Sequence, residues 1–133
     1  MITLSDFKNW VKTVVRGYDN YYVGMINDAS KEKQLGVYHM DNNSPKRNII
    51  GGKKNKKYAY KDIKLLVHGT KGATSTERLA YETYNALDTE SDFEIGGTKV
   101  NFIEILNEDP IPMGIDDNNI FEYVIRLRIH FKI

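Results

Sequence analysis

The sequence predicts an α+β domain in which two main helices pack on one face of a mainly antiparallel sheet of about five to six strands. Two segments carry apolar residues at helical spacing, and the last thirteen residues alternate between apolar and polar side chains. Turn-forming residues separate further β-rich runs between these segments. With 133 residues and 41% hydrophobic residues, the chain is expected to form one domain, residues 1–133.

The first helix is predicted over residues 4–16. Apolar residues recur at helical spacing from Leu4 to Val15. Thr3 or Ser5 is placed to cap the start of this helix, and Gly17 is placed to end it. The predicted helix is therefore amphipathic, with one face toward the sheet.

The second helix is predicted within "GTKGATSTERLAYETYNALD". Thr74 and Glu77 match the capping-box pattern, and an apolar stripe follows from Leu79 onward. The preceding turn holds Gly69 and Gly72 but lacks the spacing of a phosphate-binding loop. We therefore expect an ordinary capped helix start rather than an anion site.

Three β-rich regions precede the last strand. The runs "NYYVGMI" and "KQLGVYHM" flank the polar "NDASKE" and predict a hairpin. The run "KYAYKDIKLLVHG" predicts a strand with a bulge near Lys61, because its apolar alternation changes face between Tyr60 and Ile63. "FEIGGTKVNFIEIL" predicts a hairpin that turns at its Gly-Gly pair.

The final segment, "NIFEYVIRLRIHFKI", predicts one long strand with a buried and a solvated face. Thirteen extended residues would span roughly 40 Å, well beyond a typical strand of about five or six residues. We therefore expect this strand either to bend sharply or to pair partly outside its own domain.

The sequence predicts no catalytic, cofactor-binding or metal-binding site. His39, His68 and His130 fall on different predicted strands without the spacing of metal ligands, and each is expected to be hydrogen-bonded or half-exposed. "GIDDNNIF" lacks the ligand order of a calcium loop and predicts a turn. There is no cysteine, no nucleophile motif and no apolar run long enough to cross a membrane. A soluble protein made in the cytosol is expected.

The near-neutral total charge hides a strong segregation. Residues 45–64 carry eight Lys and Arg against one Asp, whereas residues 77–117 carry eleven Asp and Glu against two basic residues. Such asymmetry can orient one copy of a protein against another. The candidate assembly or channel loop comprises Lys46, Arg47, Lys53, Lys54, Lys56 and Lys57, within a loop 41–57 that is expected to be flexible. The candidate acidic partner surface comprises Glu90, Asp92, Glu94, Glu108, Asp109, Asp116 and Asp117.

The basic stretch also allows a second function. Lysines neutralise phosphates without reading bases, and Tyr58 and Tyr60 could stack on bases. The alternative hypothesis is thus a small nucleic-acid-binding module that uses the Lys-rich stretch 46–64. Against this, both tyrosines fall on one strand face, where core packing is more common, and water alone would satisfy such a loop.

The order of segments and two local sequences resemble a known family. "LLVHGTKGATSTERLAYETYNAL" and "EDPIPMGIDDNNIFEYVIRLRIHF", with "DDNNIFEYVIRL" as the most recognisable part, are similar to the minor capsid proteins of long-tailed phages of Gram-positive bacteria. This group includes the tail terminator proteins. The similarity covers most of residues 1–133 and is strongest from Leu65 onward.

The resemblance implies a structural protein of a phage or prophage, without enzymatic activity or cofactors. Its members form a homo-oligomeric ring, usually of six subunits, that caps the tail tube and joins the tail to the head connector. The expected partners are therefore further copies of the chain, the tail tube protein and the head–tail connector proteins, with no membrane. The protein would be made in the host cytoplasm and located at the tail–head junction of the virion. The basic loop would line the channel, where DNA passes, or contact a neighbouring subunit or the tube.

Overall fold

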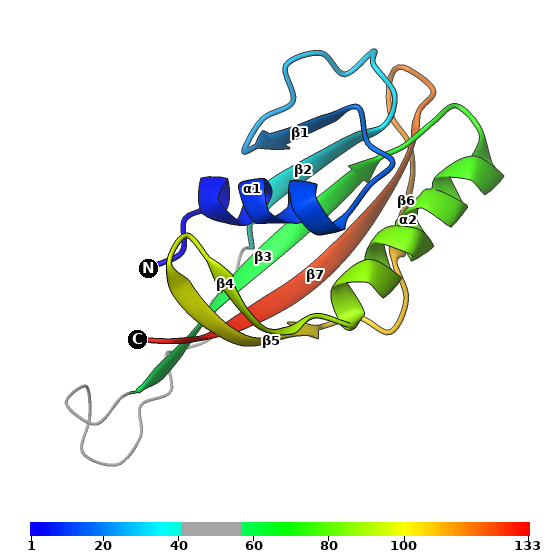
Figure 1. Cartoon of the computed structure of the whole chain (residues 1–133). Helices are drawn as coiled ribbons and strands as arrows, with labels where there is room; N and C mark the ends of the chain where they lie inside the picture. Colours follow the sequence, from blue (N-terminus) through cyan, green and yellow to red (C-terminus); the bar gives the residue numbers. More distant parts are fainter. Residues whose placement is uncertain (41–56) are drawn as a thin grey trace.

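The computed structural model describes residues 1–40 and 57–133, and its helices and strands form one curved sheet with two helices on the same face (Figure 1). The strands follow the order β1-β2-β3-β7-β5-β4, and β6 pairs with β7 off this path. The α+β class and the one-sided helices are confirmed, and the described residues form seven strands instead of the expected five to six. The elements are α1 (Leu4–Val14), β1 (Asn20–Val23), β2 (Gln34–His39), β3 (Tyr58–His68), α2 (Ala73–Asp88), β4 (Ser91–Ile95), β5 (Thr98–Ile105), β6 (Ile111–Ile115) and β7 (Phe121–Lys132).

Strand β7 is the long strand expected from the alternating pattern, and it pairs within its own sheet. An antiparallel ladder joins it to β3 from Tyr58↔Lys132 to His68↔Glu122 without interruption. Its other edge is shared by β5 near the end of the strand and by β6 near its start. The expectation that part of this strand pairs outside its own domain is therefore wrong, because two shorter strands together occupy the second edge.

The predicted hairpin of β1 and β2 is also wrong, because the two strands are parallel. Asn20 lies beside Gln34 and Val23 beside Val37. Residues 24–33 return the chain to the starting end of β1, beginning at Gly24, which has a φ of 79°. The parallel arrangement is held by Lys33, whose N–H donates to the Gly69 carbonyl at 2.7 Å and whose carbonyl accepts from the Asp19 N–H.

Strand β3 has no bulge at Lys61. Its register with β7 is continuous, so Tyr58 and Tyr60 lie on the sheet face away from the helices, whereas Ile63 is fully buried beneath them. The change in hydrophobic alternation arises because the core-facing side is only half-buried at Ala59 and Lys61, where polar atoms can reach water. The same register places Tyr58 and Tyr60 outside the core, although core packing is the more common fate of tyrosines on one strand face.

The hairpin of β4 and β5 is confirmed. Gly96 and Gly97 form the turn between Ile95 and Thr98, with φ values of 55° and 81°. A two-residue turn with positive φ at both positions matches the twist of the flanking strands and favours glycine.

The two helices begin differently. At α1 the Thr3 hydroxyl accepts from the Asp6 N–H and the Asp6 carboxylate accepts from the Thr3 N–H, each at 3.0 Å, which is a complete capping box. At α2 the N-cap is Gly72, without a side-chain cap, so the capping box predicted from Thr74 is wrong. Instead, the Thr76 hydroxyl lies 2.9 Å from the Gly72 carbonyl and accepts from the Thr70 N–H.

The core lies between the helices and the inner face of the sheet. Tyr18 connects the two helices, since it follows α1 and its hydroxyl lies 2.6 Å from the hydroxyl of Thr83 in α2. Trp10 of α1 stacks on Phe93 of β4 with ring centroids 4.4 Å apart. Fully buried apolar side chains include Phe7, Val11, Leu35, Val37, Ile63, Leu65, Val67, Leu87, Val100, Ile125, Leu127 and Ile129.

Among the described residues, no helix combines the length and hydrophobicity needed to span a membrane.

The capping box predicts a specific loss of stability. Thr3→Ala removes the acceptor for the Asp6 N–H and is expected to lower the free energy of unfolding by about 1 kcal/mol. Ser5→Ala, in the exposed first turn of the same helix, is the matched control and should change this free energy by less than about 0.5 kcal/mol. Urea unfolding measures both, and equal effects of the two variants would contradict the assigned cap.

Acid should weaken the same capping box. Hydrogen bonds from the Thr3 backbone and side chain lower the pKa of Asp6. A carboxyl with a lowered folded-state pKa stabilises the fold above its unfolded pKa of about 3.9, and this contribution is lost as the pH falls through the folded pKa. The stability difference between the native protein and Asp6→Ala should therefore narrow below about pH 4. Unfolding curves of both proteins at pH 7 and pH 3 measure this difference in stability. The same difference at both pH values would contradict the prediction.

Candidate assembly surface

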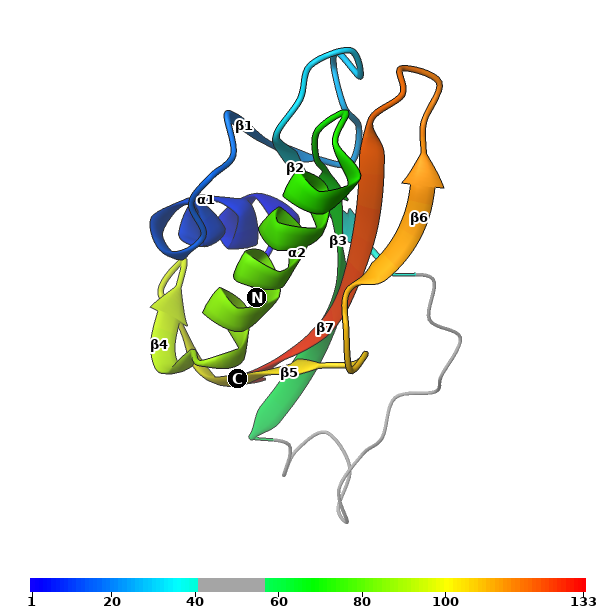
Figure 2. The ribbon, with the colours of Figure 1, turned by 90° about the vertical axis from the view of Figure 1, so that its right-hand side faces the viewer.

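The sheet has an outer face, which is the face opposite to α1 and α2. Figure 2 shows both helices to one side of the strands. Within residues 1–40 and 57–133, no helix covers the outer face. Polar and aromatic side chains of β3, β7 and β5 therefore lie at or near the surface there, where they can contact another molecule.

A bidentate ion pair lies at the centre of the outer face. The register of β3 and β7 places Asp62 opposite Arg128, and the two guanidinium–carboxylate distances are 2.7 Å and 3.1 Å. The hydrogen bond to Asp62 raises the pKa of Arg128. The guanidinium carbon also lies 4.1 Å from the ring centroid of Tyr60. These contacts fix the plane of the guanidinium, which is a favourable geometry for recognising a carboxylate or a flat ring.

A second group on the outer face combines an imidazole, a ring and an acid. His130 Nε2 lies 2.9 Å from Glu104 Oε1, and the imidazole stacks on Phe102 with centroids 4.3 Å apart. Phe102 is 46% exposed. We name these six residues the outer strip: Tyr60, Asp62, Phe102, Glu104, Arg128 and His130.

Further rings lie on the outer face at β1 and β2. The ring of Tyr22 packs directly on Gly36, where a Cβ atom would lie 2.4 Å from Tyr22 Cζ. The hydroxyls of Tyr22 and Tyr38 are 3.2 Å apart, and burial raises the pKa of Tyr22. Lys64 Nζ lies 5.6 Å from the ring centroid of Tyr38. Aromatic rings therefore extend along the outer face from β1 to β5.

Strand β6 forms a surface of different chemistry. Among the described strands it pairs with β7 alone, so its other edge is free. Met113 and Ile115 on this strand are 58% and 54% exposed. An apolar strand with a free edge is a ready site for contact with another protein chain.

Most of the candidate basic loop lies outside the described residues. This applies to Lys46, Arg47, Lys53, Lys54 and Lys56, whose role stays a prediction. Lys57 is described, exposed and placed directly before β3, with its carbonyl accepting from the Ile133 N–H at 2.9 Å.

The seven candidate acidic residues are distributed over three places. Glu90, Asp92 and Glu94 follow the end of α2 along β4, Glu108 and Asp109 lie between β5 and β6, and Asp116 and Asp117 lie between β6 and β7 (Figure 1). The length of β6 separates the last two from Glu108 and Asp109. The structure therefore does not gather the seven acids on one surface, and their role as a partner surface stays a prediction.

The turn predicted in "GIDDNNIF" is confirmed. Asp116 Oδ1 accepts from the N–H groups of Asn118 and Ile120, at 2.9 Å and 3.0 Å. Asn119 has a φ of 61°, which asparagine tolerates better than most residues.

The outer strip was not identified from the sequence. Alternation in the last strand did predict that Arg128 and His130 are solvated, but their partners Asp62 and Glu104 depend on the register of three strands. The sequence separation of 66 residues between Asp62 and Arg128 explains why no local pattern revealed the pair.

Comparison with known proteins gives the chain a family. Residues 5–133 match the sequence model of a family described as bacteriophage tail terminator protein. The chain belongs to this family. No curated protein and no solved structure matches it. Family membership gives this tail terminator protein a structural role in the phage tail, a place in the virion and interactions with other tail and head proteins. The resemblance to tail terminator proteins is thus confirmed.

The central ion pair of this tail terminator protein predicts the effect of its removal. Arg128→Ala should lower the free energy of unfolding by about 1–2 kcal/mol, because it removes two hydrogen bonds from a carboxylate whose side chain is 7% exposed. Arg128→Lys keeps the charge but cannot form two parallel hydrogen bonds with the carboxylate, so the loss of stability should be intermediate. Arg126→Ala, at an exposed position on the same strand, should change the free energy by less than about 0.5 kcal/mol. Denaturant unfolding measures all three, and equal losses for Arg126→Ala and Arg128→Ala would contradict the assignment.

Proposed function

We propose that this tail terminator protein assembles as a homo-oligomeric ring, of six subunits, which caps the tail tube and joins the tail to the head connector. The proposal rests on membership of the tail terminator family. In this proposal the protein is not an enzyme, and its surfaces bind other proteins without chemical change.

One observation in the structure supports the ring. A ring is built from heterologous contacts, in which one surface of a subunit meets a different surface of the next. The free edge of β6 is apolar at Met113 and Ile115, whereas the outer strip is charged and aromatic. Two surfaces of such different chemistry on one chain favour head-to-tail contact over face-to-face contact.

The basic loop would act within the same ring. Its lysines and Arg47 would line the channel and contact passing DNA without sequence preference, or would reach a neighbouring subunit or the tube. The acidic residues of β4 and of the β5–β6 connection would then offer complementary charge to a partner.

Disruption of the β6 edge tests the ring. Met113→Glu and Ile115→Glu place a charge on the free edge and are expected to lower the fraction of rings at least tenfold. Met25→Glu is the matched control, since Met25 is 74% exposed in the connection between β1 and β2 and should leave the rings unchanged. Native mass spectrometry and negative-stain electron microscopy, with and without tail tubes, measure the ring fraction. A protein that stays monomeric with tubes present would contradict the proposal.

A second candidate function has support from the outer face. Tyr58 is 58% exposed and follows Lys57, and Phe102, Arg126 and Lys132 lie on the same face of the sheet. Exposed rings beside cations suit stacking on a single-stranded nucleic acid. The alternative is therefore a nucleic-acid-binding module that acts as a monomer or dimer.

Salt dependence separates the two candidates. A nucleic-acid module should bind a labelled oligonucleotide with an affinity that falls steeply with increasing salt concentration. This binding should be lost when Lys53, Lys54, Lys56 and Lys57 are all replaced by alanine. Tyr58→Ala should weaken binding of single strands more than of duplexes. Fluorescence anisotropy measures both, and rings with no binding at low salt would exclude this alternative.

A further inference from the structure

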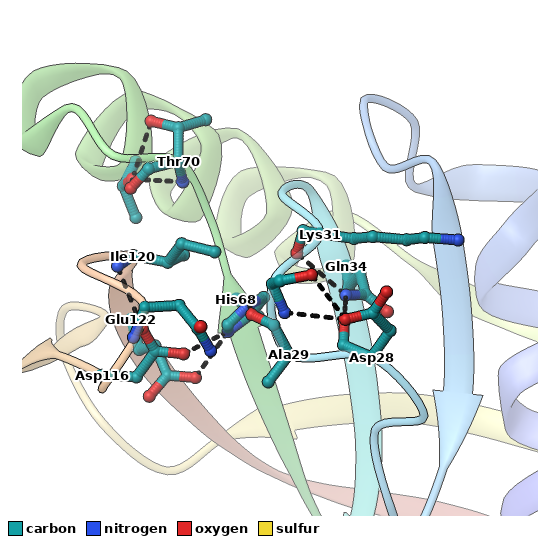
Figure 3. A network of polar contacts seen from close by, with 12 residues as sticks. Asp28, Ala29, Lys31, Gln34, His68, Thr70, Asp116, Ile120 and Glu122 are labelled. Atoms are coloured by element: carbon teal, nitrogen blue, oxygen red, sulfur yellow. Dashed lines mark hydrogen bonds and ion pairs between the residues drawn. The ribbon is translucent and has the colours of Figure 1, made fainter.

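A buried histidine meets two carboxylates at the end of β3 (Figure 3). His68 is 1% exposed, and its Nδ1 lies 2.8 Å from Glu122 Oε2 and 3.7 Å from Asp116 Oδ2. The ligand atoms of the three residues all lie within 4.8 Å of one another. The expectation that His68 is an isolated, hydrogen-bonded strand residue is therefore incomplete, because the fold brings two carboxylates to it.

The hydrogen bonds of His68 determine which ring nitrogen faces the acids. Nε2 lies 2.9 Å from the Ala29 carbonyl, which can only accept, so Nε2 carries a proton. A neutral imidazole then has its lone pair on Nδ1. Both Asp116 and Glu122, which lie near Nδ1, carry carboxylates, and these are acceptors when ionised. Three electron-pair donors therefore face one another, an arrangement that a proton or a metal ion between them would stabilise.

The surrounding structure holds each donor in place. Gln34 donates to the carbonyls of Asp28 and Lys31 at 2.8 Å and 2.9 Å, which fixes the connection that brings Ala29 to His68. Asp116 uses Oδ1 for the turn between β6 and β7, which leaves Oδ2 directed at His68. Glu122 lies directly opposite His68 in the β3–β7 ladder. Such supporting contacts are typical of metal ligands, whose other nitrogen commonly donates to a backbone carbonyl.

We propose that His68 Nδ1, Asp116 Oδ2 and Glu122 Oε2 bind a divalent transition-metal ion, with Zn²⁺ as the best match. Zn²⁺ binds imidazole nitrogen and carboxylate oxygen at about 2.0–2.2 Å, so tetrahedral ligand atoms lie roughly 3.3–3.6 Å apart. The observed separations of 2.8 Å and 3.7 Å bracket this value. Asp116 and Glu122 are 18% and 21% exposed, so solvent can reach the cluster and supply a water as the fourth ligand.

The bound ion would join three parts of the chain. Asp116 belongs to the β6–β7 turn, His68 ends β3, and the Ala29 carbonyl links the imidazole to the connection between β1 and β2. Because an unfolded chain does not present these ligands together, metal binding adds to the stability of the folded state. Zinc is therefore expected to raise the thermal midpoint of unfolding.

Two conservative variants test the site in the whole protein. Glu122→Gln replaces a carboxylate by an amide that can donate to Nδ1 of neutral His68, so the fold should persist. Asp116→Asn keeps an oxygen for the turn and removes the second carboxylate oxygen. Glu104→Gln is the matched control, because Glu104 pairs with His130 at 2.9 Å on the outer strip. This experiment does not depend on ring formation.

Isothermal titration of the metal-free protein with ZnCl₂ at pH 7.5 should give one site per chain and a higher unfolding midpoint. Glu122→Gln and Asp116→Asn should each weaken zinc binding at least tenfold, whereas Glu104→Gln should bind as the native protein does. Nitrogen NMR should show His68 Nδ1 without a proton in the zinc-bound form.

Three results would overturn the proposal. The first is the absence of saturable zinc binding by the native protein. The second is a zinc affinity of both site variants that equals that of the native protein, which would place the zinc at another histidine. The third is protonation of both His68 nitrogens at saturating zinc, which would mean that a proton is the positive centre.

Discussion

The register of the β3–β7 ladder is the constraint on which the rest of the structure depends. In this register Ile63 and Leu65 of β3 lie beside Leu127 and Ile125 of β7, and all four are fully buried. A slip of one residue would turn each of these side chains to the outer face. Since burial of such a side chain is worth about 2 kcal/mol, the apolar face alone specifies the register.

The polar face follows from the same register. Asp62 meets Arg128, Tyr60 meets His130, and His68 meets Glu122, because each pair lies directly across the ladder. Paired charges that leave water gain little net stability, since desolvation offsets much of their attraction. The two faces of the sheet therefore have different roles. The inner face provides stability, and the outer face holds charged and aromatic groups in fixed positions.

Local patterns were sufficient for the elements whose contacts are local. The apolar spacing of α1, the Gly-Gly turn of the β4–β5 hairpin and the alternation of β7 are all visible in neighbouring residues. The parallel pairing of β1 with β2 depends on contacts such as that of Lys33 with Gly69, which no local pattern reveals. The start of α2 differs from the predicted capping box at Thr74, because the Thr70 N–H donates to the Thr76 hydroxyl and the helix begins after Gly72.

The candidate site was predictable only in part, for the same reason. Alternation in the last strand placed Arg128 and His130 on a solvated face, but not their partners. His68 and Glu122 are 54 positions apart, and neither belongs to a recognisable ligand motif. Asp116, the third ligand, belongs to a predicted turn and lies far from every histidine in the sequence. Only the folded ladder brings these groups together.

The central position of β7 has a consequence for how the chain folds. Pairs that lie side by side at the centre of the sheet are separated by 54 and 66 residues in the chain, so long loops must close before they can form. The β4–β5 hairpin can form early, whereas β3 keeps an open edge until β7 is synthesised, and β7 comes last. At about 5–20 residues per second, a ribosome would leave that edge unpaired for several seconds. During this interval the unpaired edge of β3 is a site at which another chain can pair, and the strand order itself sets how long it stays open.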